Sequence, residues 1–393
     1  MSKSAITEQF DLVGFDPRGV GATEPAVDCN LTDGSAAGTA LLAKIGTPFP
    51  TLTENDTQEL ADRCANGSGG MEVLEHMGTR TTAKDMDVLR EVLGEEKLNF
   101  LGQSYGSRLG TVYAEEFPEN VRAMVLDGAF DPNLGPQERL LASYGGFQQQ
   151  FDTLAAFCAE QADCPLGTDP AAATTALQDI IRPLADNPVP AGDSELNFDG
   201  ALGGVMGGLY SPDNWPLVIE GLREVQQGRG DQLFQMANAI GGVSAEGESS
   251  NLLDSSIVIN CVDEDQLVGE DRAQLQADTY EVAPMMDPGG AMGEGARDKC
   301  ADFPTTGELN IPYAQDIPGL PSTLVVSLTG DATTPHTGAV ALAETLGSTL
   351  LTVEDDGHTV IANGVNACAD AIAAAYLIDL EIPEEDQTCA ADT

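Results

Sequence analysis

Short apolar runs alternate with helix-spaced apolar residues along the first part of the chain. The runs that predict buried strands are Phe10–Asp16, Leu98–Leu101 and Ala123–Leu126. The segments with helical spacing are Thr82–Leu93, in which Met86, Leu89 and Leu93 share a face, and Ser107–Phe117. Gly94 and Pro118 follow these two segments as stop signals. Strands that alternate with helices at this spacing predict parallel βαβ units.

The pattern changes in the middle of the chain and then returns. From about residue 136 to residue 303 it is mostly helical, with breaks rich in Gly, Ser and Asp. Beyond this stretch, the strands predicted are Ser322–Leu328 and Thr349–Val353, and the helices are Ala339–Leu346 and a last one from Gly364 onward. We therefore predict an α/β core in two parts, residues 1–135 and 311–393, separated by a helical lid insertion over residues 136–310.

Charge and composition exclude several classes of partner. The chain of 393 residues has 64 acidic and 17 basic side chains, a formal net charge of −47. Nucleic acids and anionic membranes would repel such a surface. No apolar run reaches the roughly 18 residues that a membrane span requires. The acidic excess is compatible with adaptation to salt and equally with an ordinary acidic secreted protein.

Cysteine usage favours an oxidising compartment. The chain has eight cysteines without a Cys-x-x-Cys pair and only three scattered histidines, so we expect neither a metal site nor a cofactor. Disulfides in an extracellular, secreted protein are the better interpretation. Met1–Phe10 has no apolar signal-peptide core, so we expect the export segment to have been removed; the alternative is that the cysteines stay reduced.

The segment Gly102-Gln103-Ser104-Tyr105-Gly106 fits the pattern Gly-x-Ser-x-Gly. It lies between the predicted strand Leu98–Leu101 and the helix from Ser107, which is the setting of a nucleophile elbow. We predict that Ser104 is the nucleophile, that the backbone N–H of Tyr105 faces the oxyanion, and that close backbone approach requires both glycines. The alternative is an ordinary glycine-rich turn between strand and helix.

A serine nucleophile needs a base and an acid. His358 follows the predicted strand Thr349–Val353, whereas His336 lies at a helix start and His76 in a polar connection. Asp331 follows the strand before it and could also be a helix cap. The order Ser104, Asp331, His358 along the chain is that of the α/β-hydrolase fold, so we predict these three as a catalytic triad.

Several stretches resemble the actinobacterial tripeptidyl aminopeptidases, a branch of the α/β-hydrolase peptidases that also includes the prolyl aminopeptidases. The matching stretches are Phe10–Gly21, Thr81–Arg90, Leu98–Gly110, Gly330–Pro335 and the lid motif Ile259–Asp263. The resemblance covers nearly the whole chain. It implies a secreted serine exopeptidase that releases short peptides from free amino termini, with the same three residues at the catalytic positions.

The resemblance also implies a covalent framework and one difference from the family. Together with proximity in the sequence, it implies the disulfides Cys29–Cys64, Cys158–Cys164, Cys261–Cys300 and Cys368–Cys389. The family has a His-Gly-Gly-Pro-Gly-like loop upstream of Phe10 that supplies a second oxyanion N–H. This sequence has no such loop, so we expect half of the oxyanion hole to be absent. A truncated chain, a processed fragment and a variant with a rebuilt hole all remain open.

Substrate choice is expected in the lid insertion. A buried carboxylate can bind the α-ammonium group of a peptide, and Asp263 and Glu264, followed by Asp265, form the most suggestive cluster because the lid motif overhangs the site in the family. The alternative is a solvated acidic loop. We expect Trp215 to pack within the lid.

Two other functions are compatible with the sequence. A carboxylesterase that cleaves small esters would use the same triad, and an inactive relative could act as a binding protein. We expect a peptide or small ester as substrate and a monomeric protein.

Overall fold

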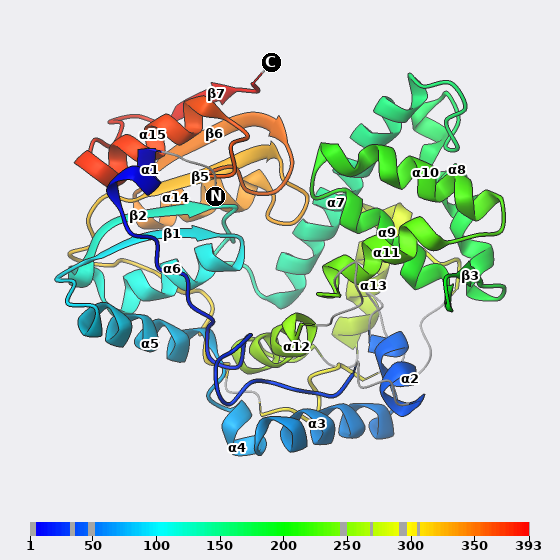
Figure 1. Ribbon diagram of the computed structural model, residues 1–393, viewed down its shortest axis with the longest axis horizontal. Helices are drawn as coiled ribbons and strands as arrows, with labels where there is room; N and C mark the ends of the chain where they lie inside the picture. Colours follow the sequence, from blue (N-terminus) through cyan, green and yellow to red (C-terminus); the bar gives the residue numbers. More distant parts are fainter. Residues whose placement is uncertain are drawn as a thin grey trace. The chain divides into compact units, whose positions relative to one another are not determined.

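The computed structural model describes residues 5–31, 36–45, 52–243, 250–267, 270–290, 297–304 and 307–392. The chain forms two compact units. The first consists of residues 1–15, 77–146 and 307–393, and the second of residues 16–76 and 147–306. Each unit is thus built from segments that are far apart in the sequence, as the colours of Figure 1 show.

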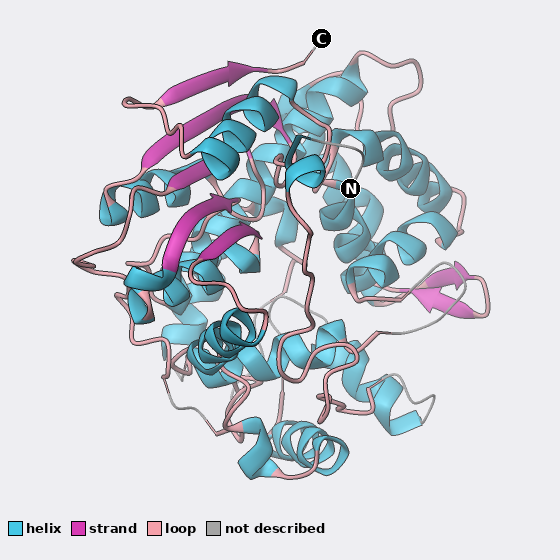
Figure 2. Cartoon of the chain, turned by 60° about the vertical axis from the view of Figure 1, so that its left-hand side comes forward, coloured by secondary structure: helices cyan, strands magenta, loops and turns pink. Residues whose placement is uncertain are grey.

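A five-stranded parallel sheet forms the centre of the first unit (Figure 2). Its strands, in the order of the sheet, are β1 (Leu98–Gln103), β2 (Val121–Asp127), β5 (Leu324–Gly330), β6 (Thr349–Asp356) and β7 (Gln387–Ala390). The predicted strands in these regions are therefore present, and β7 at the edge was not predicted. Because the strands are parallel, the loops after β1, β2, β5 and β6 leave from the same edge of the sheet.

Helices cover both faces of this sheet (Figure 1). One face packs on α5 (Thr79–Val92), α6 (Tyr105–Glu116) and α14 (His336–Leu346), and the other packs on α1 (Ala5–Gln9) and α15 (Ala367–Asp379). Successive side chains of a strand alternate between the two faces. In β5, Val325 belongs to the first cluster, whereas Leu324 and Val326 belong to the second. Both faces of β5 are thus buried, which explains its apolar run Leu324–Val326.

The second unit is mostly helical. Its helices are α2 (Ala36–Ile45), α3 (Glu54–Ser68), α4 (Met71–Leu74), α8 (Ala173–Ile181), α9 (Phe198–Gly208), α10 (Trp215–Gln226), α11 (Asp231–Ile240), α12 (Leu252–Asp263) and α13 (Glu270–Val282). The strands β3 (Val189–Ala191) and β4 (Ser194–Leu196) form a small antiparallel hairpin. The long helix α7 (Pro136–Ala159) begins in the first unit and ends in the second. Trp215 is buried beside Phe157, with 5.5 Å between ring centroids.

Four disulfides cross-link the chain. Three lie in the second unit, Cys29–Cys64, Cys158–Cys164 and Cys261–Cys300, and Cys368–Cys389 joins α15 to β7 in the first. No cysteine is free. No helix in the described part of the chain is long and apolar enough to cross a bilayer.

The prediction of a strand over Phe10–Asp16 is wrong. The segment has no regular secondary structure, and Leu12 and Val13 are 50% and 58% exposed. A strand requires a hydrogen-bonded neighbour, and the edge strand β1 pairs with β2 alone in the described sheet. The apolar run therefore lacks the partner that would bury it.

The compact units also divide the chain differently from the predicted boundaries. Residues 16–76 group with the helical insertion rather than with the sheet. The Asn251 side chain donates to the carbonyl groups of Gly19 and Val27, and the Asp254 carboxylate accepts from the Cys29 N–H at 2.7 Å. These hydrogen bonds join residues 16–76 to the start of α12, which explains why residues 16–76 group with the helical insertion.

Candidate active site

Ser104 lies on the turn between β1 and α6 with a strained backbone. Its φ and ψ are 55° and −119°, in a region that residues with a side chain rarely adopt. Its N–H donates to the Asp127 carbonyl at 2.9 Å. A Cβ atom added to Gly102 would lie 2.3 Å from the Gly106 carbonyl oxygen, so this position requires glycine. A Cβ on Gly106 meets nothing within 4 Å, so the expectation that both glycines are sterically required is wrong for Gly106.

Tyr105 is the first residue of α6, directly after Ser104. Backbone N–H groups in the first turn of a helix have no partner within the helix and favour a nearby negative charge. The phenol oxygen of Tyr105 lies 2.7 Å from Thr79 Oγ1 on α5, which anchors the side chain. The backbone N–H of Tyr105 therefore lies at a helix end suited to stabilise an oxyanion next to Ser104.

Asp331 directly follows β5, and its side chain is fully buried. One oxygen, Oδ1, accepts from the backbone N–H groups of Thr333 and Thr334, and Oδ2 accepts from the Thr334 hydroxyl at 2.9 Å. The cap of α14 is Pro335, so Asp331 is not the helix cap that the sequence left open. Three donors instead orient its carboxylate toward the loop after β6.

His358 lies on that loop, and its Nδ1 is 2.8 Å from Asp331 Oδ2 and 3.0 Å from Oδ1. An ionised carboxylate only accepts hydrogen bonds, so Nδ1 carries the proton of this contact. The neutral imidazole then has its lone pair on Nε2, which is the tautomer that a general base requires. The other two histidines have different settings: burial lowers the pKa of His336 at the start of α14, and His76 is exposed.

The loop that carries His358 is held by Asp127, a residue that the sequence analysis did not select. Asp127 ends β2 and is fully buried. Its Oδ2 accepts from the backbone N–H groups of Val360 and Ile361, both at 2.8 Å. Gln103 Nε2, next to Ser104, donates to the Ile361 carbonyl at 2.9 Å. Burial raises the pKa of Asp127 to about 6, against the hydrogen bonds that lower it.

Gly128 was also missed as a site residue. It has a φ of +67°, and an added Cβ would lie 3.3 Å from His358 Cε1 and 3.1 Å from Thr334 Oγ1. The His358 ring therefore packs directly over this backbone. The sequence offered one signal: Asp127-Gly128 directly follows the predicted strand Ala123–Leu126, and the ends of parallel strands meet at one edge of the sheet, where Ser104 also lies.

The predicted substrate-binding residues lie in the second unit. Asp263 is the last residue of α12 and is 1% exposed, and Glu264 follows as its C-terminal cap at 7% exposure. Asp265 is exposed, as expected for a solvated charge. The neighbouring Cys261–Cys300 disulfide and a hydrogen bond from Gln266 to the Cys300 carbonyl restrain this segment. The interpretation as a solvated loop thus fits Asp265 but not the two buried carboxyls.

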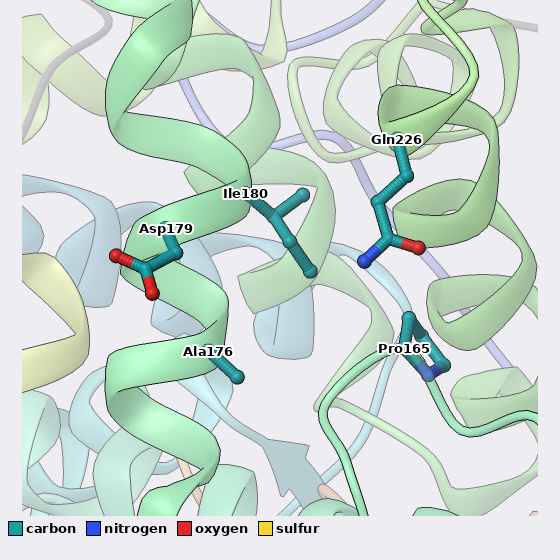
Figure 3. A pocket seen from close by; sticks show the side chains of 5 residues that line it. All are labelled: Pro165, Ala176, Asp179, Ile180 and Gln226. Carbon is teal, nitrogen blue, oxygen red and sulfur yellow. The ribbon is translucent and has the colours of Figure 1, made fainter.

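Two cavities lie among the helices of the second unit, and no triad residue lines either. One has a volume of about 380 Å³ and is lined by Pro165, Gln226 and the α8 residues Ala176, Asp179 and Ile180. Figure 3 shows that Ile180 points toward Gln226 and Pro165, whereas the Asp179 carboxylate points to the other side of its helix. The other, of about 1020 Å³, lies between the β3–β4 hairpin and helices α9 to α11.

Comparison with known families matches residues 2–365 to the family described as alpha/beta hydrolase fold. The chain belongs to this family. This match confirms the fold predicted from the sequence, and together with the relatives that follow it confirms the resemblance and the hydrolase class of the enzyme.

Three relatives match this hydrolase over nearly its whole length. "Serine protease Hip1" of Mycobacterium tuberculosis is 39% identical over 98% of this chain and 75% of its own. "Carboxylesterase B" of the same species is 37% identical over 98% of this chain and 74% of its own. "Tripeptidyl aminopeptidase" of Streptomyces coelicolor is 30% identical over 99% of this chain and 72% of its own. The protein is a serine hydrolase.

Proposed function

We propose that this hydrolase releases short peptides from free amino termini, with Ser104 as nucleophile, His358 as general base and Asp331 as its acid partner. The observation that carries the proposal is the 2.8 Å contact between His358 Nδ1 and Asp331 Oδ2. It lies on loops at the sheet edge from which the strained turn of Ser104 also leaves.

The reaction follows from the chemistry of these groups. His358 Nε2 takes the proton from Ser104 Oγ as this oxygen attacks the scissile carbonyl carbon. The Tyr105 N–H stabilises the negative charge that develops on the carbonyl oxygen. The imidazolium, stabilised by Asp331, returns the proton to the leaving amine, and an acyl-enzyme remains on Ser104. Water, activated by His358, then hydrolyses the ester and restores the serine.

Relatives named for peptide cleavage support a peptide substrate, and the buried Asp263 and Glu264 support recognition of a cation. A carboxylate that binds the substrate ammonium ion would explain a requirement for a free amino terminus. Ester hydrolysis is the second candidate, because the relative named carboxylesterase B is similar to this chain at almost the same level.

Labelling by a fluorophosphonate probe tests the nucleophile, because only an activated serine reacts. We expect the wild-type protein to be labelled and Ser104→Ala and His358→Ala to remain unlabelled, whereas His336→Ala reacts at the wild-type rate. Labelling of Ser104→Ala would refute the assignment of the nucleophile. An unlabelled wild-type protein would favour an inactive, binding relative.

Paired substrates test the specificity. We expect a tripeptidyl anilide with a free amino terminus to be cleaved with a higher kcat/KM than its N-acetylated form. Asp263→Asn should reduce cleavage of the free peptide and leave hydrolysis of p-nitrophenyl butyrate nearly unchanged, with Asp265→Asn as the exposed control. A preference for N-acetylated peptides would exclude the aminopeptidase, and equal losses on both substrates would assign Asp263 a structural role.

We also propose that the protein is located outside the cytoplasm. Four disulfides support a location outside the cytoplasm, where such bonds persist. Thiol titration of the denatured, unreduced protein checks this point, and we expect no reactive thiol.

A further inference from the structure

The loop that carries the proposed base requires restraint from its surroundings. Thr359 and Ala362 have φ values of 60° and 61°, in the left-handed region that is costly for residues other than glycine. A loop with such strained positions keeps its conformation only where contacts outside it hold it in place. Any movement of this loop displaces the His358 ring, on whose position proton transfer depends.

We propose that Asp127 is a positioning residue for catalysis, which holds the His358 loop in register with the turn that carries Ser104. The inference rests on the proposed triad. Asp127 acts through His358 and is fully buried, so it has no access to substrate.

One residue makes both connections. The Asp127 backbone carbonyl accepts the N–H of Ser104, and the Asp127 carboxylate accepts the N–H groups of Val360 and Ile361, the second and third residues after His358. Gln103 adds a parallel link from the residue before Ser104 to the Ile361 carbonyl. The nucleophile and the base are therefore tied to the same strand end, at 2.8–2.9 Å in each contact.

The buried charge distinguishes this role from simple packing. Asp127 Oδ1 has no hydrogen-bond partner among the described residues. Hydrogen bonds therefore stabilise only one of the two carboxylate oxygens. A neutral side chain with one acceptor oxygen could accept both N–H groups at lower cost, because a buried charge is expensive. An ionised acceptor, however, forms stronger hydrogen bonds to backbone N–H groups than a neutral one.

The ionisation of Asp127 should therefore appear in the pH dependence of activity. Asp331, after β5, repels the charge on Asp127, and the uncharged Gln103 of β1 faces its carboxylate. The His358 ring lies against the neighbouring Gly128. Burial places the pKa of Asp127 at about 6. As the pH falls through this value, Asp127 loses its charge and its hydrogen bonds to the His358 loop weaken, so we expect the activity to fall in this range.

The test compares Asp127→Asn and Asp127→Ala with wild type, using p-nitrophenyl butyrate and the rate of fluorophosphonate labelling. We expect Asp127→Ala to lower kcat about 100-fold, as a misplaced catalytic group does, with little change in KM. Asp127→Asn retains an acceptor oxygen and should recover part of this loss. Its activity should lack the loss that protonation of Asp127 causes near pH 6, so it should fall less steeply with acidification than the activity of the wild type.

Asp370→Ala is the matched control. The Asp370 carboxylate accepts the N–H of Ala362, in the same loop, at 2.7 Å, but it belongs to α15 and is not linked to Ser104. We expect this variant to keep nearly the wild-type kcat. The thermal midpoint of each variant identifies a folding defect. If Asp127→Ala does not fold, the kcat and the pH profile of Asp127→Asn alone test the proposal.

The outcomes separate this inference from the proposed triad. If His358→Ala is inactive but Asp127→Asn keeps the wild-type kcat and acid limb, the role of Asp127 is refuted and the triad stands. Equal losses of kcat in the Asp127 and Asp370 variants would also refute it, since they indicate general support of the loop. If His358→Ala is labelled as fast as wild type, the triad and the positioning role both fail.

Discussion

The two glycines that flank Ser104 differ in what they contribute to its conformation. A Cβ on Gly102 would collide with the Gly106 carbonyl oxygen at 2.3 Å, and this backbone cannot move without displacing the start of α6. Gly106 faces open space and has a helical position, where alanine is favoured over glycine by up to about 1 kcal/mol.

We therefore expect Gly102→Ala to slow labelling of Ser104 by about 100-fold or more, and Gly106→Ala to be labelled at close to the wild-type rate. The labelling rate of the folded variants checks this, and each variant is the control for the other. Similar losses in both would mean that the motif requires Gly106 for a reason other than steric contact.

Asp127 also makes the free energy of unfolding depend on pH. Its pKa is about 6 in the folded protein and 3.8 ordinarily, so between these values the folded state binds more protons than the unfolded one. The destabilisation is absent below about pH 4, grows as the pH rises, and is complete above about pH 6. A shift of this size corresponds to about 3 kcal/mol.

Asp127→Asn removes this titration. We expect the free energy of unfolding of the variant, relative to wild type, to increase by about 2–3 kcal/mol between pH 4 and pH 7. Urea unfolding at both pH values measures the change. If the difference in the free energy of unfolding between variant and wild type does not vary with pH, the pKa of Asp127 is the same in the folded and the unfolded protein.

Among the elements, the disulfides differ in the length of chain that they close. Cys261–Cys300 links α12 to the end of the insertion over 39 residues, whereas Cys158–Cys164 links the end of α7 to the loop that follows over only 6 residues. In the chain-entropy account, a longer loop restricts the unfolded chain more.

Replacing both members of each pair by alanine should therefore cost about 1.5 kcal/mol more for Cys261–Cys300 than for Cys158–Cys164. Chemical unfolding of the two double variants measures this difference. An equal or reversed order would indicate that strain or packing in the folded state outweighs the loop entropy.

For the whole molecule, net charge and buried carboxyls act in the same direction. The formal charge of −47 opposes the compact state by self-repulsion. Burial raises the pKa of Asp127, Asp199 and Asp254 to about 6 each, so that their ionisation also destabilises the fold above that pH. Acidification from pH 7 to pH 5 relieves both effects, and salt relieves the first by screening.

We expect the thermal midpoint to rise when the pH is lowered from 7 to 5, and to rise with salt concentration at pH 7. The response to salt should be smaller at pH 5, because fewer charges remain to be screened. Differential scanning calorimetry of the intact chain over this grid is the measurement. A midpoint that falls with salt would show that attractive ion pairs dominate the surface.

The sequence by itself determined those features that depend on neighbouring residues. The apolar runs at Leu98, Ala123, Ser322 and Thr349 become β1, β2, β5 and β6, because short apolar runs between turn residues favour strands of a parallel sheet. The Gly-x-Ser-x-Gly motif could be interpreted from its strand and helix alone. The positions of Asp331 and His358 followed from their places directly after strands.

Tertiary structure decided the features that depend on distant partners. Phe10–Asp16 resembles a strand in composition, yet it is irregular because no strand among the described residues pairs with it. Residues 16–76 join the helical unit through contacts with Asn251 and Asp254, more than 200 positions away in the chain. Asp127 supports the His358 loop from 233 positions away, a separation at which no local pattern in one sequence identifies a hydrogen-bond partner.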